Sequence, residues 1–215
     1  MSLFITKYCS IKNNQVSIDG NIDFTFKDSL EFGKFIRAAY RYYKIRYPKF
    51  FKMDNLCKLG FLTAEILLKD QKILQSYTSD EISIILTNSS SSLETDEKHF
   101  ETIKDRDHYY PSPSIFVYTL PNIMSGEISI RHKIKGENAV FICEKYDPDF
   151  IYNQAKLTLG KERVKSCITG RVEYYDNNYE SLLFLVEKEN NIKDKNVKSE
   201  FIIFNVANLD EIYKS

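Results

Sequence analysis

Two short apolar runs, rich in β-branched residues, constrain the fold of this chain more than any other feature. They are ISIILT at residues 82–87 and AVFIC at residues 139–143, and polar residues flank both. A continuous run of this length is typical of a strand that is buried on both faces of a sheet. Segments with helical spacing separate the runs, so the sequence predicts an α/β fold, with a mixed, mostly parallel sheet and helices on both faces.

Other segments of strand-like density are further candidates for strands, and a sheet of about five strands is expected. The candidates besides the two central runs are residues 3–11, 164–174, 181–188 and 200–207. Each is short, apolar and bounded by polar or turn-forming residues, which is typical of strands.

Two capped helices are predicted between the first strand and residue 82. The first is expected to start at the pair Asp28 and Glu31, and the second at Asp54, whose carboxylate can accept from a free N–H of the first turn. The first helix has apolar residues at a spacing of three and four, which predicts that one face is buried. These residues are Phe32, Phe35, Ile36, Ala39, Tyr40 and Tyr43.

Three further helices are predicted after residue 90. Ser91 and Glu94 form a possible capping pair for a short helix through His99. A helix is expected over residues 119–131, with Pro121 in its first turn. Another is expected to start at Asp147 and to run to about residue 159.

Composition excludes several classes of protein. Thirty basic and thirty acidic residues cancel in a chain of 215 residues, so no global charge favours nucleic acid or an anionic membrane. No apolar run reaches the roughly 20 residues of a membrane span, and the first 15 residues do not resemble a signal peptide. A single domain over residues 1–215, located in the cytoplasm, is therefore expected.

The four cysteines are far apart in the sequence. Cys9, Cys57, Cys143 and Cys167 form no CxxC pair and have no nearby histidine, so free thiols are expected rather than disulfides or a zinc site. Neither a metal nor a cofactor is predicted.

The segment SPSIFVYTLPNIMSGEISIRHKIKGENAVFIC, residues 112–143, resembles the β-ketoacyl-acyl-carrier-protein synthases. In that family a helix containing Asn and Gly is followed by a segment like IRxGIKGPN, a buried strand and a nucleophilic cysteine. The match extends over about 30 positions. The matching residues are Pro121, Asn122, Gly126, Ile128, Ile130, Arg131, Ile134, Lys135, Gly136 and Asn138.

The resemblance implies the first half of the duplicated thiolase-like fold, and it places the nucleophile near Cys143. Cys143 nevertheless comes two residues too early when it is measured from Asn138, and the family's spacing falls on Lys145. Glu144 and Asp147 would oppose a thiolate, and no Gly or Ser follows to permit a tight elbow. The alternatives for Cys143 are a catalytic thiol and an inert cysteine in a buried strand.

The resemblance also implies two catalytic residues, two histidines or a histidine and an asparagine, that come from the second half of the family's fold. The three histidines of this chain, His99, His108 and His132, all precede the expected nucleophile and match neither of them. The resemblance therefore implies a non-catalytic, chain-length-factor-like subunit. Such subunits pair with a full-length ketosynthase and work with an acyl carrier protein, in pathways such as fatty acid, polyketide, aryl polyene or flexirubin synthesis.

Two groups of residues are candidates for contacts with partners. In the resemblance, Asn122, Ser125, Gly126, Ser129 and Arg131 belong to a helix near the dimer interface. The alternative is ordinary packing of that helix within one subunit.

The second group lies in a basic and aromatic stretch at residues 34–52. Arg37, Arg41 and Lys44 would form a patch for an acidic carrier protein, or for RNA if the resemblance does not hold. The alternative is the solvated face of an amphipathic helix. The competing functions are an acyl-transfer enzyme that uses Cys143 and a nucleic-acid-binding module.

Overall fold

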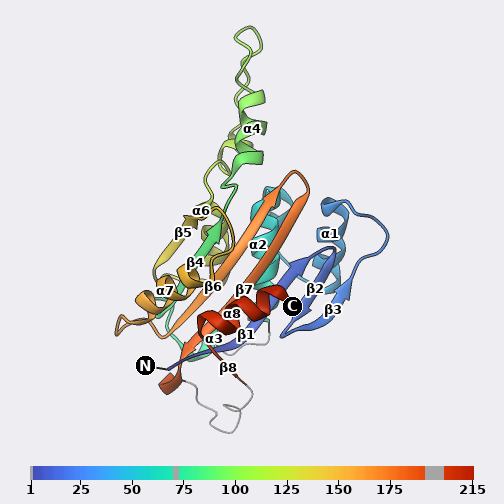
Figure 1. Ribbon diagram of the computed structural model, residues 1–215. Helices are drawn as coiled ribbons and strands as arrows, with labels where there is room; N and C mark the ends of the chain where they lie inside the picture. The colour runs from blue at the N-terminus through green and yellow to red at the C-terminus, as the bar shows by residue number, and fades with distance from the viewer. Residues whose placement is uncertain (1, 70–72, 192–200) are drawn as a thin grey trace.

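A computed structural model describes residues 2–69, 73–191 and 201–215, and its centre is one mixed sheet of eight strands (Figure 1). Seven strands follow the order β3-β2-β1-β7-β6-β4-β5, and β8 pairs with β1. Their bounds are β1 Leu3–Lys12, β2 Gln15–Ile18, β3 Asn21–Thr25, β4 Ile82–Asn88, β5 Asn138–Ile142, β6 Ser166–Tyr175, β7 Asn178–Lys188 and β8 Ile202–Ile203.

The sheet is mixed, as predicted, but it has more strands than expected and a different balance of directions. Only β4 pairs in parallel, with β5 on one side and with β6 on the other, among the pairs that the structure describes. The other pairs are antiparallel. The prediction of a mostly parallel sheet of about five strands is corrected accordingly.

The strands β2 and β3 were not predicted because they are short and largely polar. Tight two-residue turns connect them to β1 and to each other, with Asn13, Asn14 and Asp19 in the left-handed region and Gly20 at φ 81°. Asn and Gly are the residues that such hairpin turns favour. The dipeptides Asn13-Asn14 and Asp19-Gly20 were therefore available as signals.

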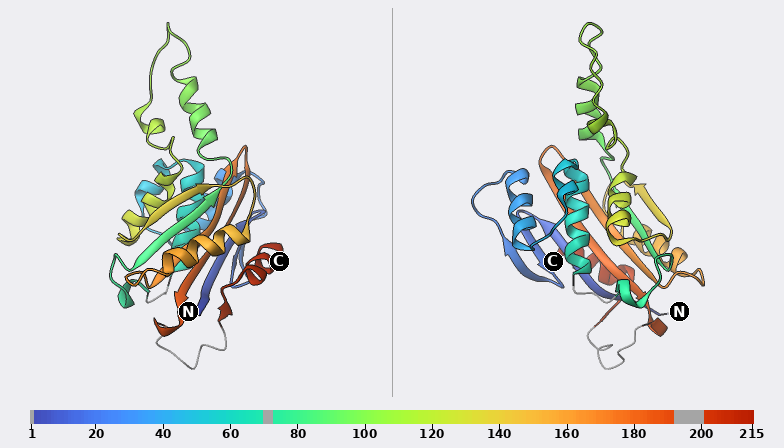
Figure 2. Two further views of the ribbon diagram at one scale, coloured as in Figure 1. Left: turned by 60° about the vertical axis from the view of Figure 1, so that its left-hand side comes forward. Right: turned by 180° about the vertical axis from the view of Figure 1, so that it is seen from behind.

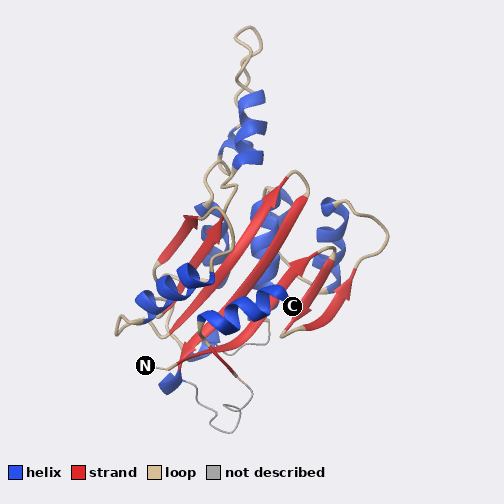
Figure 3. Cartoon of the chain, in the orientation of Figure 1, coloured by secondary structure: helices blue, strands red, loops and turns tan. Residues whose placement is uncertain are grey.

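Helices cover both faces of the sheet, as predicted (Figures 2 and 3). The buried residues of α1, α2 and α6 form one apolar core with one face, and those of α7 and α8 form a second core with the other face. The helices are α1 Phe32–Tyr42, α2 Asn55–Leu68, α3 Ile73–Ser76, α4 Leu93–Glu101, α5 Pro113–Phe116, α6 Asn122–His132, α7 Pro148–Leu159 and α8 Val206–Lys214. Two short 3-10 helices, η1 Pro48–Lys52 and η2 Glu189–Asn191, complete the described elements.

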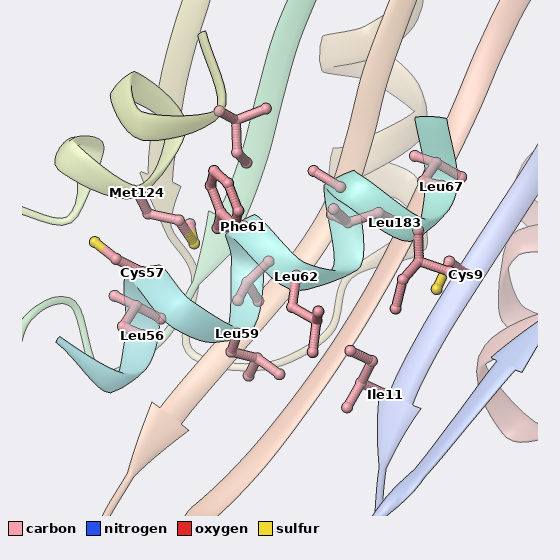
Figure 4. Close-up of a cluster of buried hydrophobic side chains, with 14 of the residues drawn as sticks. Cys9, Ile11, Leu56, Cys57, Leu59, Phe61, Leu62, Leu67, Met124 and Leu183 are labelled. Carbon is pink, nitrogen blue, oxygen red and sulfur yellow. The ribbon is translucent and has the colours of Figure 1, made fainter. Parts of the chain in front are cut away.

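The helix α2 is the centre of the larger core. It is buried on nearly all sides because it packs against the sheet, α1 and α6. Figure 4 shows Leu62 pointing from α2 toward Ile11 of β1, while Cys57 lies beside Met124 of α6. A helix that is apolar on all sides is typical of such an interior position.

The predicted helix starts were confirmed where an aspartate caps the helix. Asp54 accepts a hydrogen bond from the Cys57 N–H (2.8 Å), and Asp147 accepts one from the Phe150 N–H (2.9 Å). The Asp28–Glu31 pair was wrong, because α1 begins at Phe32 and Glu31 makes no side-chain cap.

The Ser91–Glu94 pair was also wrong. Ser91 lies in the left-handed region (φ 54°), and the residue before α4 is Ser92. The hydroxyl of Ser92 donates to the Thr119 carbonyl (2.8 Å) instead of capping α4.

The prediction of a strand at residues 200–207 was largely wrong, and residue 200 lies outside the described residues. Only Ile202 and Ile203 pair with β1. The side chain of Asn205 then accepts a hydrogen bond from the Asn208 N–H (2.8 Å) and starts α8. An Asn at this position is a favoured helix cap, which the apolar run obscured.

Candidate functional site

Cys143 lies immediately after β5, where β5 and β4 end side by side. Its backbone N–H donates to the carbonyl of Asn88, the last residue of β4 (2.7 Å). The prediction of a buried strand at residues 139–143 was wrong in one respect. The strand exists, but it is the edge of the sheet, and its side chains are half-buried or exposed. Cys143 itself is half-buried, whereas Cys9, Cys57 and Cys167 are buried, and all four thiols are free.

The surroundings of Cys143 disfavour a thiolate. Burial raises the pKa of the Cys143 thiol, and the carboxylate of Asp147 raises it further, while Arg171 opposes both effects. The amino end of α7 lies four residues beyond Cys143, and Asp147 already caps it. The helix dipole that lowers the pKa of a catalytic cysteine therefore does not act on this sulfur directly.

Next to Cys143, the carboxyl ends of β4 and β6 hold a polar network around Arg171. The guanidinium is buried (5 % exposed) and donates to Glu180 from Nε (3.2 Å) and to Glu173 from Nη2 (3.3 Å), as well as to the hydroxyl of Ser89. Glu173 also accepts from the backbone N–H groups of Ser89 (2.6 Å) and Ser90 (3.1 Å). The sequence analysis did not find this network, because its members are spread over three segments and each residue type alone is unremarkable.

Each of the three histidines lies next to a residue other than Cys143. The ring of His99 packs on Phe116 (5.2 Å between centroids). Nδ1 of His108 lies 3.0 Å from Asp105 in an exposed turn, and Nε2 of His132 lies 2.9 Å from Oε1 of Glu65.

The residues predicted near a dimer interface all lie on α6, but their side chains have different contacts. Asn138, at the start of β5, holds the helix through Ser125 (2.6 Å) and Ser129 (2.9 Å). Asn122 is exposed at the first position of α6. A Cβ atom added at Gly126 would meet no atom within 4 Å, so Gly126 serves no close contact within the chain.

Arg131, the last member of that group, is engaged inside the chain. It forms a bidentate pair with the buried Glu65 of α2 through Nε (2.9 Å) and Nη2 (3.1 Å). Its guanidinium also stacks over the ring of Tyr47 (5.3 Å). This pair ties α6 to α2.

A projecting arm stands next to β5 at the same end of the molecule. It consists of residues 89–118, with α4 and α5, and it extends well beyond the sheet in every view (Figures 1 and 2). The arm, the residues just after it and the last residue of β5 expose large apolar side chains. These are Leu93, Phe100, Tyr109, Tyr110, Phe116, Val117, Leu120 and Ile142, while Ile130 is exposed in the last turn of α6, away from the arm.

The basic residues of the 34–52 stretch do not form one continuous patch. Arg37 and Arg41 are on the exposed side of α1, whose other side is buried as predicted. Lys44 lines a separate cavity, and Lys49 forms an ion pair with the buried Glu127 of α6 (2.7 Å).

In the part of the chain that the structure describes, no group of three or more His, Cys, Asp or Glu side chains could hold a metal ion. No helix in residues 2–69, 73–191 or 201–215 combines the length and the apolar character that a membrane span requires.

Comparison by sequence finds nothing: no family model matches this chain, and no curated protein matches it. Comparison with solved structures gives consistent matches. The ishigamide ketosynthase/chain length factor has a TM-score of 0.65 and 16% identity, over 90% of this chain and 64% of that chain. The complex of the ketosynthase ApeO with its chain length factor ApeC, from Xenorhabdus doucetiae, has a TM-score of 0.54 and 13% identity, over 87% of this chain and 79% of the other.

A β-ketoacyl synthase from Burkholderia phymatum STM815 also matches, with a TM-score of 0.58 and 10% identity, over 93% of this chain and 60% of that one. The chain therefore has the fold of one half of a thiolase-like protein, and the fold expected from the segment 112–143 is confirmed. The chain spans 64% of the length of the ishigamide protein, less than two thirds of it.

Proposed function

We propose that this chain is a non-catalytic, chain-length-factor-like subunit, a single domain that pairs with a full-length ketosynthase in the cytoplasm. The observation that carries the proposal is the apolar surface around β5. Monomeric proteins rarely leave an edge strand and a neighbouring projecting arm uncovered when both carry large apolar side chains. A second protein that covers this surface would also extend the sheet.

The names of the matched structures support the choice of partner. The ApeO structure is a ketosynthase in complex with its chain length factor. The AntDE:AntF structure, which matches with a TM-score of 0.59 and 10% identity over 93% of this chain and 64% of that chain, contains a ketosynthase with an acyl-carrier protein. We propose the same classes of partner for this chain. Asn122, Gly126 and Ser129 would lie at or near the contact with the ketosynthase. Arg37 and Arg41 on the exposed side of α1 would face the carrier protein, without Lys44, which lines a separate cavity.

The state of Cys143 supports a non-catalytic role. An acyl-transfer enzyme needs a thiolate at neutral pH, and the pKa of this thiol is raised. The alternative, an acyl-transfer enzyme that uses Cys143, would require a partner to remove the influence of Asp147. Intact-mass spectrometry after incubation with an acylated carrier protein tests that alternative, and an adduct that disappears in Cys143→Ala would favour it.

Co-expression with a ketosynthase from the same genome tests the pairing. Size-exclusion chromatography with light scattering should show a one-to-one complex that Ile142→Lys weakens at least tenfold, because the substitution puts a charge on the apolar edge. Leu157→Lys is the matched control, since Leu157 is also apolar and exposed (69 %, against 54 % for Ile142) but lies on α7. A chain that stays monomeric in the presence of the ketosynthase would refute the proposal. Equal loss of binding in Ile142→Lys and Leu157→Lys would refute it as well.

A further inference from the structure

A basic cavity lies at the end of the molecule opposite to Cys143. It has a volume of about 750 Å³ and opens between the last turns of α1, α2 and α6 and the first residue of β4, Ile82. The backbone N–H of Cys143 is hydrogen-bonded to Asn88, at the other end of β4. Seven strand residues separate the two places by about 20 Å, so the cavity is separate from the region discussed above.

The charge of this cavity is strongly one-sided. Five of its described lining residues are cationic, and one, Glu65, is a carboxylate. The whole chain has a formal net charge of +0, so the excess is local. The cationic residues are Lys44, Arg46, Lys69, Arg131 and Lys133.

The single carboxylate is already occupied. Glu65 accepts both hydrogen bonds of the Arg131 fork and lies 2.9 Å from Nε2 of His132. Burial alone would raise the pKa of Glu65, but the nearby His132 and the hydrogen bonds from Arg131 outweigh it, and the pKa lies below its usual value. Glu65 therefore stays ionised and fixes the Arg131 guanidinium at the wall of the cavity.

Basic residues at helix ends often do no more than complement the helix dipole. That explanation fits Lys7 at the carboxyl end of α2, because its Nζ donates to the carbonyls of Ile66 (3.3 Å) and Lys69 (3.2 Å). Lys69 has a different contact, since its ammonium lies over the ring of Tyr43 (5.6 Å).

The same account does not suit Lys44, Arg46 and Lys133. They form no ion pair with any residue that the structure describes. Lys44 (φ 54°) and Lys133 (φ 57°) also hold the left-handed conformation just past the ends of α1 and α6. Glycine is the favoured residue at such positions. Two helices thus end in a disfavoured lysine at the same cavity.

We propose that this cavity binds a phosphate group, either free or as a phosphate monoester. Lys44, Arg46 and Lys133 would neutralise a dianion, and the fixed guanidinium of Arg131 would donate from its remaining nitrogen. A phosphate fits because its oxygens accept from several charged donors at once, and such charge-assisted bonds are the strong ones. This binding does not depend on a ketosynthase partner.

Isothermal titration of the purified chain with inorganic phosphate and with glycerol 3-phosphate, at constant ionic strength, tests the proposal. Saturable binding with a Kd of about 1 mM or tighter is expected for at least one of them. Tighter binding of glycerol 3-phosphate would identify an ester as the ligand, and equal binding would identify the phosphate group itself. No saturation by either would overturn the proposal.

The double variant Lys44→Gly/Lys133→Gly should weaken the binding at least tenfold. The double variant removes two positive charges. It should preserve the fold, because glycine adopts the left-handed conformation of both positions more easily than lysine does, and circular dichroism would show this. The control Lys27→Ala/Lys52→Ala removes the same charge from exposed positions outside the cavity and should change Kd less than twofold. Equal weakening in both double variants would mean diffuse charge attraction and would overturn a defined site.

Discussion

Asp147 accepts a hydrogen bond from the backbone N–H of Phe150 (2.9 Å) and so occupies the amino end of α7. This is the place where a helix could stabilise a thiolate, and here it stabilises a carboxylate instead. The cap also brings a negative charge near Cys143, where it contributes to the raised pKa of the thiol. Asp147 therefore stabilises α7 and also disfavours the thiolate form of Cys143 that acyl transfer would require.

Cys143 should consequently react slowly with iodoacetamide. A thiol with a raised pKa stays protonated at pH 7.5, so its alkylation should be slower than that of free cysteine and should rise with pH beyond pH 9. Peptide mapping by mass spectrometry would separate Cys143 from the three buried cysteines.

The variant Asp147→Asn tests the electrostatic part of this explanation. Asparagine keeps the cap but removes the charge, so alkylation at pH 7.5 should become faster by about two- to fourfold. An unchanged rate would mean that burial alone controls the reactivity of this thiol.

Gly136 and Gly126 should respond to alanine in opposite ways. A Cβ atom at Gly136 would lie 2.1 Å from the Ile82 carbonyl oxygen, which is backbone and cannot move easily. We expect Gly136→Ala to lower the free energy of unfolding by about 3 kcal/mol. Gly126 has open space and lies within α6, so Gly126→Ala should raise it by about 0.5–1 kcal/mol.

Urea denaturation followed by circular dichroism measures both changes. Gly126→Ala has a second use, because a stabilised chain that no longer binds a ketosynthase would place Gly126 at the contact. A destabilising Gly126→Ala, or a neutral Gly136→Ala, would contradict the packing described for this segment.

The sequence predicted the elements whose signals are local. The helices capped by Asp54 and Asp147 were correct, because a single carboxylate sets the first residue. The buried run 82–87 was also correct, because a strand between two neighbours is apolar on both faces.

Features that depend on distant partners could not be predicted in this way. The run 139–143 is as apolar as a central strand, yet it forms the edge of the sheet. The pairing of Glu65 with Arg131 joins residues 66 positions apart. The cavity beside that pair is formed by three helix ends, whose meeting point no local pattern determines.

Arg171 should be far more important for stability than its counterpart on the surface, Arg163. Its removal in Arg171→Ala leaves the carboxylates of Glu173 and Glu180 near each other without their shared cation. We expect a loss of about 3–5 kcal/mol in the free energy of unfolding.

Arg163→Ala is the matched control. Its partner is Asp80, and the Arg163 side chain is mostly exposed, so the loss should be about 0.5 kcal/mol or less. Similar losses in the two variants, measured by urea denaturation, would show that the buried network contributes no more than a surface pair.

The ion pair between Glu65 and Arg131 should make stability depend on pH in the acidic range. The pKa of Glu65 is lower in the folded chain than its usual value, so ionised Glu65 favours the folded state. This contribution is complete above the unfolded pKa of about 4.3 and is lost as pH falls through the lower, folded pKa.

Glu65→Gln should therefore destabilise the chain by about 1–2 kcal/mol at pH 7, because Arg131 is partly exposed and loses its partner. The difference from the parent chain should stay constant down to about pH 5 and shrink at lower pH. Urea midpoints measured from pH 7 to pH 3 test this dependence. A difference that grows as pH falls would mean that Glu65 is more easily protonated in the folded chain, which contradicts the bonds described here.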